Sequence, residues 1–387
     1  MRAVSKSFPG TLAVDNVDLA VSAGEVHAVV GENGAGKSTL MKILAGSFSD
    51  YAGEIQINGV KIGLHTPAAA QSAGIAMIYQ ELSLAPALSV AENIMAGRLP
   101  VRFGVLDRRR LREEARTWCD KVGLAVSPDT LVEDISQHEA QLVEIAKALS
   151  RLPCILVMDE PTSSLSREET DRLFEIIRKL RRDGLAIIYI SHHLSEIFGI
   201  ADRVTVMRDG RRIDTRAIGE LTPEMLIGMM VGRAGDDLYR GGVRKRTTGG
   251  PRLRVEGLTR YGFFRDISFH VREGEILGIG GLCGSGRTEL ARSLIGADPV
   301  DSGAVFMNDR KVRTGRMSAA MKAGMAYLTE ERKTYGLALR LSTAENALAA
   351  LIPRHSAWFH YSRRKGDALL GGLMKQLEVR PDDPTVT

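Results

Sequence analysis

The chain has 387 residues, which is enough for two or three domains, and its 44% hydrophobic and 26% charged residues are ordinary for a globular protein. The net charge of +5, from 52 basic and 47 acidic residues, is too small to favour a nucleic-acid-binding protein. Three widely separated cysteines argue against a disulfide framework, and no apolar run reaches the roughly 18 residues needed to span a bilayer. We therefore expect a soluble protein of a reducing cytoplasm.

The first predicted elements are an apolar strand over 26–30, a glycine-rich turn and a helical pattern that continues to Leu44. The turn and the start of the helix read Gly31, Glu32, Asn33, Gly34, Ala35, Gly36, Lys37, Ser38 and Thr39. This order fits the P-loop pattern, in which glycines let successive backbone N–H groups point at phosphate oxygens. We expect ATP as the ligand, with Lys37 reaching its β- and γ-phosphates and the Ser38 hydroxyl binding Mg²⁺.

Further along the chain, 139–149 has apolar residues at helical spacing, and strands are predicted over 155–158 and 185–190. The strand over 155–158 ends in Asp159 and Glu160. Asp159 suits indirect coordination of Mg²⁺, and Glu160 suits polarising the water that attacks a phosphate. An apolar run that ends in Asp-Glu is a weak signal by itself, but it is a strong one downstream of a P-loop.

The second half of the chain repeats the first. Residues 24–40 return as 274–290, an offset of 250 positions, and beyond residue 330 the offset becomes 253. The repeated P-loop consists of Gly281, Gly284, Gly286, Arg287 and Thr288. Arginine keeps the charge of Lys37, but its planar guanidinium is bulkier than an ammonium on a thin stem. We therefore predict that the second half is poor at hydrolysis.

The alternation of strands and helices predicts an α/β fold of two tandem P-loop NTPase domains. Each is expected to hold a mainly parallel sheet with flanking helices and a helical subdomain. The first domain is predicted over 1–235, with its helical subdomain at about 83–150. A linker is predicted over 236–250, because this stretch is rich in Gly, Arg and Lys and poor in apolar residues. The second domain is predicted over 251–387.

With a P-loop and an Asp-Glu strand in this order, the whole chain resembles the ABC ATPase family. The resemblance implies that Gln80 contacts Mg²⁺ and the membrane subunit, and that His192, after the strand over 185–190, touches the γ-phosphate. It also implies that Phe8 stacks on adenine and that 161–166 forms the D-loop. A lone Gln or His is usually a surface or capping residue, and Phe8 could be a core residue. The order and spacing of these residues relative to the P-loop favour the functional assignments.

Two nucleotide-binding halves, the second degenerate, are similar to the monosaccharide importer branch of the family, as are the segments 1–11, 143–149 and 202–210. This resemblance implies ATP hydrolysis that energises import of ribose, xylose, galactose or a related solute. It implies a membrane permease and a periplasmic sugar-binding protein as partners, and no nucleic acid. The chain would then lie peripherally on the cytoplasmic face of the bacterial inner membrane, bound through its partner.

The sequence departs from the family pattern at the signature loop, which normally reads LSGGQ. The corresponding residues are Ser136, Gln137, His138 and Glu139. Both glycine positions are filled, and Glu139 adds negative charge near a triphosphate. Signature loops pair crosswise with the P-loop of the other half. We therefore expect one degenerate and one competent composite site.

The repeat places the signature loop of the second half just beyond Thr387, so we expect a C-terminally truncated second domain; the first strand also looks clipped at Met1. Whether the chain alone hydrolyses ATP is left open. Two other functions remain as alternatives. One is a soluble tandem ABC ATPase that acts on ribosomes or DNA, against which the replaced glycines and the short linker argue. The other is a nucleotide-binding but catalytically inactive fragment.

Overall fold

The computed structural model divides the chain into two compact units, Met1–Gly242 and Val243–Thr387. It describes all residues except 9–10, 164, 233–248, 282–283, 330–334, 350–355, 358–359, 362, 378, 380–382 and 386–387. Most of the predicted linker, 236–250, therefore lies outside the described residues. None of the helices in the described part of the chain has the length and apolar character needed to cross a bilayer.

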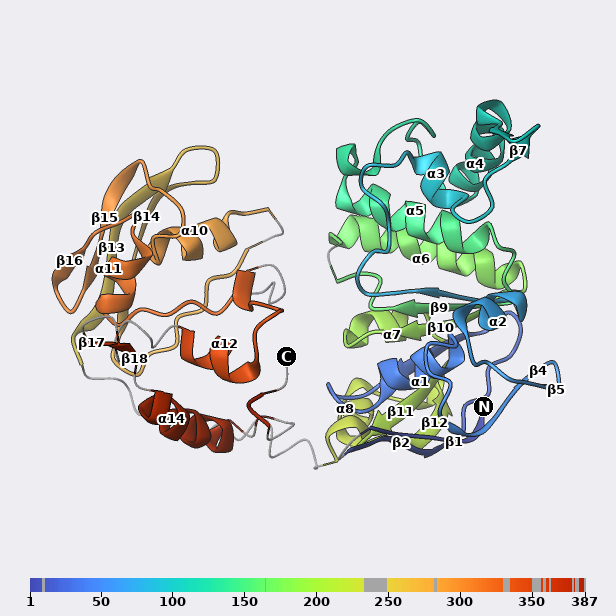
Figure 1. Cartoon of the computed structure of the whole chain (residues 1–387), viewed down its shortest axis with the longest axis horizontal. Coiled ribbons are helices and arrows are strands. Elements are labelled where there is room, and N and C mark those ends of the chain that lie inside the picture. Colours follow the sequence, from blue (N-terminus) through green and yellow to red (C-terminus); the bar gives the residue numbers. More distant parts are fainter. Residues whose placement is uncertain are drawn as a thin grey trace. The chain divides into compact units, whose positions relative to one another are not determined.

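The first unit is built around a six-stranded sheet (Figure 1). In spatial order its strands are β12 (Arg211–Ala217), β11 (Arg203–Arg208), β3 (Val26–Val30), β10 (Ala186–Ile190), β9 (Ile155–Asp159) and β6 (Ile75–Ile78). All neighbours run parallel except β12, which is antiparallel to β11. Strands β3 and β10 are buried along their full length, as expected of strands covered on both faces. The parallel sheet predicted for the first domain is confirmed.

One face of this sheet is covered by α1 (Lys37–Leu44) and by a second, antiparallel sheet (Figure 1). In spatial order that sheet consists of β2 (Thr11–Val17), β1 (Arg2–Phe8), β4 (Ala52–Ile57) and β5 (Val60–Ile62). Successive side chains of a strand point to opposite faces, and β3 follows this rule. Val29 packs in the cluster that contains Leu40 of α1, whereas Ala28 and Val30 belong to the cluster on the other face.

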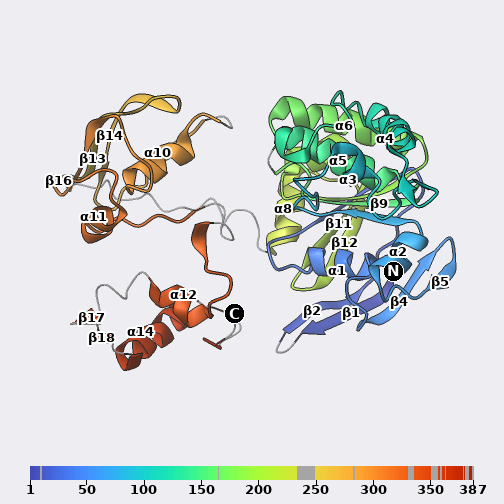
Figure 2. The ribbon, with the colours of Figure 1, turned by 45° about the horizontal axis from the view of Figure 1, so that its top comes forward.

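The other face carries α6 (Arg167–Arg182) and a helical layer, part of which packs directly on β6 (Figures 1 and 2). That layer contains α3 (Val90–Ile94), α4 (Arg108–Val122) and α5 (Gln137–Leu149), with a small hairpin of β7 (Val101–Arg102) and β8 (Val105–Leu106). The helix predicted over 139–149 lies within α5. The remaining elements are α2 (Pro67–Ser72), α7 (Leu194–Ile200), α8 (Pro223–Val231) and the 3-10 turns Val132–Asp134 and Ile218–Glu220.

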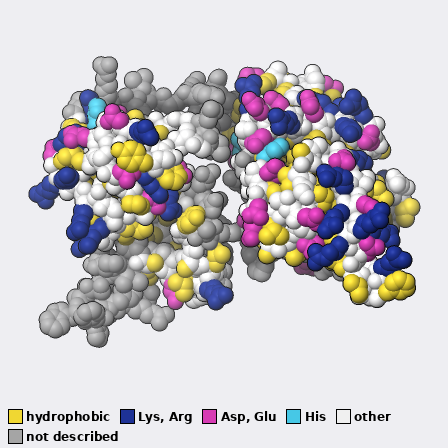
Figure 3. All heavy atoms as spheres, turned by 90° about the horizontal axis from the view of Figure 1, so that it is seen from above, with side chains coloured by type: hydrophobic (Ala, Val, Ile, Leu, Met, Phe, Trp, Pro, Cys, Tyr) yellow, Lys and Arg dark blue, Asp and Glu magenta, His cyan; other side chains and the backbone are white. Residues whose placement is uncertain are grey.

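Basic and acidic side chains are interspersed over the helical face of the first unit (Figure 3). On α4, Arg109 pairs with Glu113 and Arg110 pairs with Glu114, each one turn further along the helix. Over the described residues of this face both signs of charge occur, which agrees with the small net charge of the chain.

The second unit contains a four-stranded antiparallel sheet. In spatial order its strands are β14 (Phe264–Arg272), β13 (Pro251–Arg260), β15 (Ser302–Met307) and β16 (Arg310–Val312). Its other elements are α10 (Arg287–Leu294), α11 (Met317–Lys322), α12 (Thr343–Ala349), α14 (Arg363–Gln376), and a hairpin of β17 (Ser356–Ala357) and β18 (His360–Tyr361). By the repeat offset of 250, this sheet corresponds to the antiparallel sheet of the first unit.

The described part of the second unit departs from the prediction in one respect, because it holds no parallel sheet. Residues 276–280, the counterpart of β3, form no strand, and Ile276 is 75% exposed. The physical reason is pairing: β3 lies between β10 and β11, and no counterpart of these two strands occurs among the described residues of the second unit. A parallel strand without neighbours has unpaired backbone N–H and C=O groups and gains nothing from an extended conformation.

Candidate nucleotide-binding site

The P-loop lies between β3 and α1, as predicted, and its glycines have the backbone conformations that the turn requires. Gly36 caps α1 with a φ of 93°, in the left-handed region that L side chains rarely adopt. A Cβ atom there would also collide with the carbonyl oxygen of Ala13. Glu32, Asn33 and Gly34 are exposed at the turn, whereas Gly31 and Ala35 are buried and Thr39 lies within the first turn of α1. The loop therefore presents its backbone to solvent at the helix N-terminus, where phosphates bind.

Lys37 is the first residue of α1 and is buried. Its Nζ donates hydrogen bonds to the carbonyl oxygens of Gly31 at 2.8 Å and Glu32 at 2.9 Å, which hold the ammonium against the loop. Burial lowers the pKa of the Lys37 ammonium, and the carboxylates of Glu160 and Asp159 oppose that change. The cation is therefore fixed where the charge of a bound triphosphate would lie.

Asp159 ends β9 with a buried carboxylate that lies near the Ser38 hydroxyl. Burial raises the pKa of Asp159, the neighbouring Glu160 raises it further, and Ser38 and Lys37 oppose the change. These oxygen atoms are the hard ligands that Mg²⁺ prefers. Among the described residues, no group of three or more His, Cys, Asp or Glu could hold a metal by itself. The residues fit an ion that shares its ligands with phosphates.

Three predicted residues meet at the carboxylate of Glu160. The side-chain amide Nε2 of Gln80 donates to one oxygen, Oε2, at 2.9 Å, and Nδ1 of His192 lies 3.1 Å from the other, Oε1. Gln80 follows β6, Glu160 follows β9 and His192 follows β10, so all three lie where parallel strands end. The carboxyl ends of parallel strands form one edge of the sheet, which is where such folds bind ligands.

The backbone of Glu160 is strained. Its φ is 48°, in the left-handed region, although the residue is not glycine. Its N–H donates to the carbonyl oxygen of Ile190 at 2.9 Å, which ties the end of β9 to the end of β10. Strain of this kind is held in place by surrounding structure and concentrates at functional sites. It aims the carboxylate at Gln80 and His192.

Phe8 ends β1 and packs against Phe48, with ring centroids 5.3 Å apart in an edge-to-face arrangement. The ammonium of Lys6 lies 4.8 Å from the Phe8 centroid. At 37% exposure, Phe8 is not a core residue, so the alternative that it simply fills the core is wrong. Its contact with adenine stays a prediction.

The residues at the signature position form the start of α5. Ser136 is the N-cap, and Gln137, His138 and Glu139 are the first three residues of the helix. The Ser136 hydroxyl accepts from the N–H of Glu139 at 3.3 Å, and the Glu139 carboxylate accepts from the N–H of Ser136 at 2.7 Å. This is a capping box, which the spacing Ser-x-x-Glu signals in sequence. The sequence analysis treated Glu139 only as an extra charge and missed this role.

The second P-loop opens α10 with the same local geometry but a different environment. Gly286 caps the helix with a φ of 83°, and a Cβ atom there would approach the carbonyl oxygen of Phe263. Gly281, Gly284, Arg287 and Thr288 are exposed. The buried Lys37 thus corresponds to an exposed Arg287. In the described part of this unit, nothing corresponds to the Asp-Glu strand that faces the first P-loop.

A buried carboxylate that sequence reasoning missed links the segments around Glu160 and His192. Glu196, in the first turn of α7, accepts hydrogen bonds from the hydroxyls of Thr162 at 2.8 Å, Tyr189 at 2.9 Å and Ser191 at 2.6 Å. Thr162 lies in the predicted D-loop. Burial and the Glu196 carboxylate raise the pKa of the Tyr189 phenol. The only sequence signal was an acidic residue one helical turn after His192, which does not reveal its partners.

Comparison with known proteins agrees with this geometry. The ABC transporter family model matches residues 14–163 and 264–381. The chain is 50% identical over 380 residues to ribose import ATP-binding protein RbsA 3 of Rubrobacter xylanophilus, covering 98% of this chain and 76% of the relative. It is 48% identical over 386 residues to a putative ribose/galactose/methyl galactoside import ATP-binding protein of Burkholderia ambifaria, covering 100% of this chain and 74% of the relative.

Solved structures match the fold of part of the chain. One is a crystal structure of the ADP conformation of an ATP-binding cassette of an ABC transporter, with a TM-score of 0.53 and 24% identity. The match covers 62% of this chain and 97% of that structure. At this identity the likeness shows the fold alone.

Proposed function

This chain belongs to the ABC transporter family, and we propose that it binds ATP with Mg²⁺ and hydrolyses the ATP to energise import of a small sugar. The observation that carries the proposal is the Glu160 carboxylate, held between Gln80 and His192 at the sheet edge that also presents Asp159. Sugar as the cargo is supported by the descriptions of the relatives, which are ribose and ribose/galactose/methyl galactoside import proteins. No observation favours a soluble ATPase acting on ribosomes or DNA.

In the proposed reaction, Glu160 accepts a proton from the water that attacks the γ-phosphate. Its two oxygens are already oriented by Gln80 and His192, so little reorganisation is needed when the water approaches. Lys37 and the backbone N–H groups of the P-loop offset the charge that develops on the phosphate oxygens. The second unit, with its exposed Arg287, contributes a weaker phosphate site.

The proposed ligands of Mg²⁺ are Ser38, Gln80 and Asp159. Ser38 and Asp159 lie near each other, and the Gln80 amide carries an oxygen in addition to the N–H group that donates to Glu160. Mg²⁺ held by these residues would supply positive charge that offsets the negative charge of the phosphates. Burial and the neighbouring Glu160 raise the pKa of Asp159, so a cation bound beside it would stabilise its ionised form.

The proposed contact with a membrane permease is a cleft beside Gln80. Its lining includes Tyr79 and Ser83, from the segment that contains Gln80, together with Gln71 and Arg151, and its volume is about 240 Å³. A permease segment in this cleft would touch the backbone that carries Gln80. We place the protein peripherally on the cytoplasmic face of the bacterial inner membrane, with a periplasmic sugar-binding protein delivering the cargo.

The proposal is tested by ATP turnover and by sugar uptake. The purified chain is assayed with MgATP, and Glu160→Gln, which keeps the size of the side chain but cannot take a proton, serves as the matched variant. We expect the variant to bind ATP and to turn it over roughly 10²- to 10⁴-fold more slowly, the usual contribution of a general base. In cells deleted for the gene, we expect uptake of labelled ribose or galactose to be restored by the wild type and not by Glu160→Gln.

The two arms separate the parts of the proposal. Equal turnover of the wild type and Glu160→Gln would show that Glu160 is not the base. Unchanged uptake of ribose, galactose and xylose after deletion, with turnover intact, would show that these sugars are not the cargo.

A further inference from the structure

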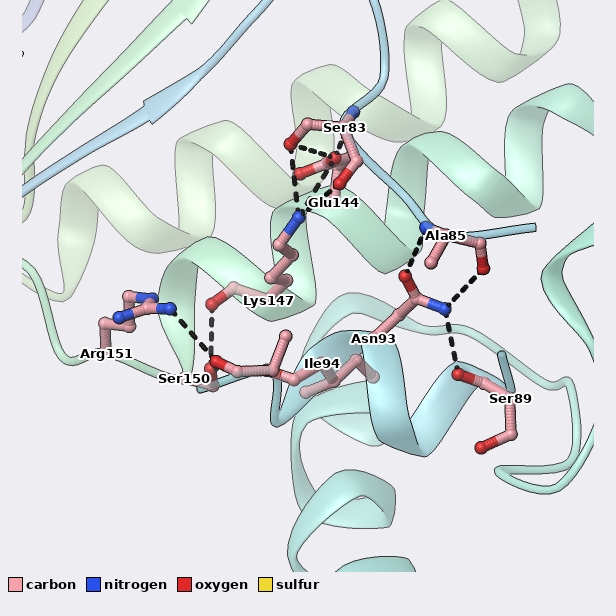
Figure 4. Close-up of polar contacts among 10 residues, drawn as sticks. Ser83, Ala85, Ser89, Asn93, Ile94, Glu144, Lys147, Ser150 and Arg151 are labelled. Carbon is pink, nitrogen blue, oxygen red and sulfur yellow. Dashed lines mark hydrogen bonds and ion pairs between the residues drawn. The ribbon is translucent and has the colours of Figure 1, made fainter. Parts of the chain in front are cut away.

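The segment that follows Gln80 is fastened to α5 through one residue, Ser83. The Ser83 N–H donates to Glu144 Oε1 at 2.6 Å, and the Ser83 hydroxyl donates to the same oxygen at 2.9 Å. The Lys147 ammonium donates to the Ser83 carbonyl oxygen at 2.7 Å and to its hydroxyl at 3.1 Å. Both backbone groups of Ser83 are therefore held by side chains one turn apart on α5 (Figure 4). We name this set of three residues the Ser83 clamp.

Burial shows that this contact is specific. Glu144 is only 5% exposed, and the Lys147 side chain is 19% exposed. A buried carboxylate is tolerated only when it is hydrogen-bonded and paired. The Lys147 ammonium lies 3.4 Å from Glu144 Oε1, further away than the Ser83 groups that both charges contact. Ser83 therefore supplies two donors to the Glu144 carboxylate and two acceptors to the Lys147 ammonium, and its displacement would remove these four contacts from two largely buried charges.

A second anchor prevents the segment from moving beyond Ser83. The Asn93 side chain accepts from the N–H of Ala85 at 2.8 Å and donates to the carbonyl oxygens of Ala85 at 3.0 Å and Ser89 at 3.0 Å (Figure 4). Only two residues separate Gln80 from Ser83. A chain advances by at most about 3.5 Å per residue, so Gln80 has little freedom to move relative to α5.

The clamp therefore connects three features. At one end, Gln80 donates to the Glu160 carboxylate. At the other, α5 begins at the N-cap Ser136, in the signature position. Glu144 and Lys147 also line the cleft beside Gln80, so an occupant of that cleft would contact the clamp directly.

We propose that Glu144 and Lys147 are positioning residues, which hold Gln80 against Glu160 through the backbone of Ser83. The inference rests on the proposed function, because it assigns hydrolysis to Glu160. It adds to that function a specific connection between the helical layer and the base. A rigid connection of this kind lets one element bias the geometry of another.

Five variants test the clamp. Glu144→Ala and Lys147→Met each remove one side of it. Glu144→Gln is the conservative variant, because its amide oxygen still accepts from Ser83 while the charge is lost. Arg110→Ala is the matched control, since it removes an exposed ion pair with Glu114 in the same helical layer. Gln80→Ala supplies the background in which the clamp has nothing to position.

The first measurement is amide hydrogen exchange at 81–85, in the chain without nucleotide. We expect the Ser83 amide to be protected in the wild type and in Arg110→Ala, and to exchange about tenfold faster in Glu144→Ala and Lys147→Met, as the loss of a charge-assisted hydrogen bond implies. Glu144→Gln should restore most of the protection. Exchange that is the same in all variants would overturn the proposal. This arm needs no hydrolysis, so it tests the clamp even if the proposed function is wrong.

The second measurement separates positioning from folding. We expect Glu144→Ala and Lys147→Met to lower kcat about tenfold while KM changes less than about twofold, because ATP binding does not use the clamp. When Glu144→Ala or Lys147→Met is combined with Gln80→Ala, kcat should be no lower than in Gln80→Ala alone. A further tenfold loss in that background would show that the clamp acts elsewhere, and the proposal would fail. If Glu144→Ala does not fold, Glu144→Gln and Lys147→Met carry the same comparison.

Discussion

The glycine that caps the P-loop helix has the same backbone conformation in both units, whereas the strand that precedes the P-loop forms only in the first. Gly36 and Gly286 both cap a helix with a left-handed φ, of 93° and 83°, and both lie against a carbonyl oxygen 23 residues upstream. Before Gly36, all of β3 is buried. Before Gly286, the corresponding residues 276–280 form no strand and Ile279 is 48% exposed.

The difference separates what a short segment can form by itself from what requires distant partners. The turn at Gly36 depends on the hairpin nearby, which is present in both units. Strand β3 depends on β10 and β11, which lie more than 150 residues away along the chain. Parallel strands always pair across long connections, so their formation is a property of the assembled sheet.

An asparagine in each unit supports this reading. Asn93 and Asn346, offset by 253 positions, each hold the loop before a short helix with the same pattern of bonds to that loop. Each helix also begins with a Ser-x-x-Glu contact. These partners lie within eight residues of the asparagine, so the motif forms wherever its local sequence occurs.

The largest difference between the units is expected in nucleotide binding. Lys37→Ala should weaken ATP binding about 30- to 100-fold, because a charge-assisted contact of about 2–3 kcal/mol is lost. Arg287→Ala, at the exposed counterpart, should change the affinity of the first site less than about twofold. Titration with a fluorescent ATP analogue measures both. Equal losses would mean that the two P-loops contribute to one site.

Stability should show the next largest difference. Val29 is fully buried in β3, and its counterpart Ile279 is half exposed. Val29→Ala should lower the free energy of unfolding by about 2 kcal/mol, whereas Ile279→Ala should cost less than about 0.5 kcal/mol. Urea unfolding of both variants and the wild type provides the comparison. A cost at Ile279 as large as that at Val29 would show that 276–280 is buried in a sheet in solution.

The smallest effect concerns pH and is specific to the first unit. Because the pKa of Asp159 is raised in the folded protein, the wild type loses stability as pH rises through that pKa. Asp159→Asn removes this titration, so the variant should be more stable than the wild type at neutral pH and lose that advantage in acid. Asp50, whose pKa is lowered by its hydrogen bond with Lys6, should show the opposite sign on Asp50→Asn. Urea unfolding at two pH values measures the stability change of each variant relative to the wild type. If the two stability changes shifted in the same direction with pH, the opposite pKa shifts of Asp159 and Asp50 would be contradicted.

Much of the site could be predicted because its signals are local or follow from sheet topology. The P-loop is a contiguous pattern, and Gln80, Glu160 and His192 each follow a strand of one parallel sheet. The end of parallel strands is a shared edge, so their meeting was implied once the strands were placed. Their chemical roles remain proposals.

Other parts could not be predicted because they depend on pairs far apart in sequence. The contact of Glu144 with Ser83 joins residues 61 positions apart, and that of Glu196 with Thr162 joins residues 34 apart. The local sequence around Glu144 or Glu196 does not indicate which residue it contacts. Glu139 is different, because its capping box with Ser136 was readable from spacing and was missed.

The unpaired segments of the second unit also have a consequence for the behaviour of a purified sample. Ile276 and Leu328 are 75% and 92% exposed, and they lie in stretches that form no strand within this chain. Exposed apolar stretches with unpaired backbone groups are templates for pairing with another molecule. At high concentration, molecules of this chain should therefore associate with one another. The turbidity of such a sample should rise with time, and the protein should bind hydrophobic dyes. Chaperones that bind extended apolar peptides should bind the second unit in preference to the first.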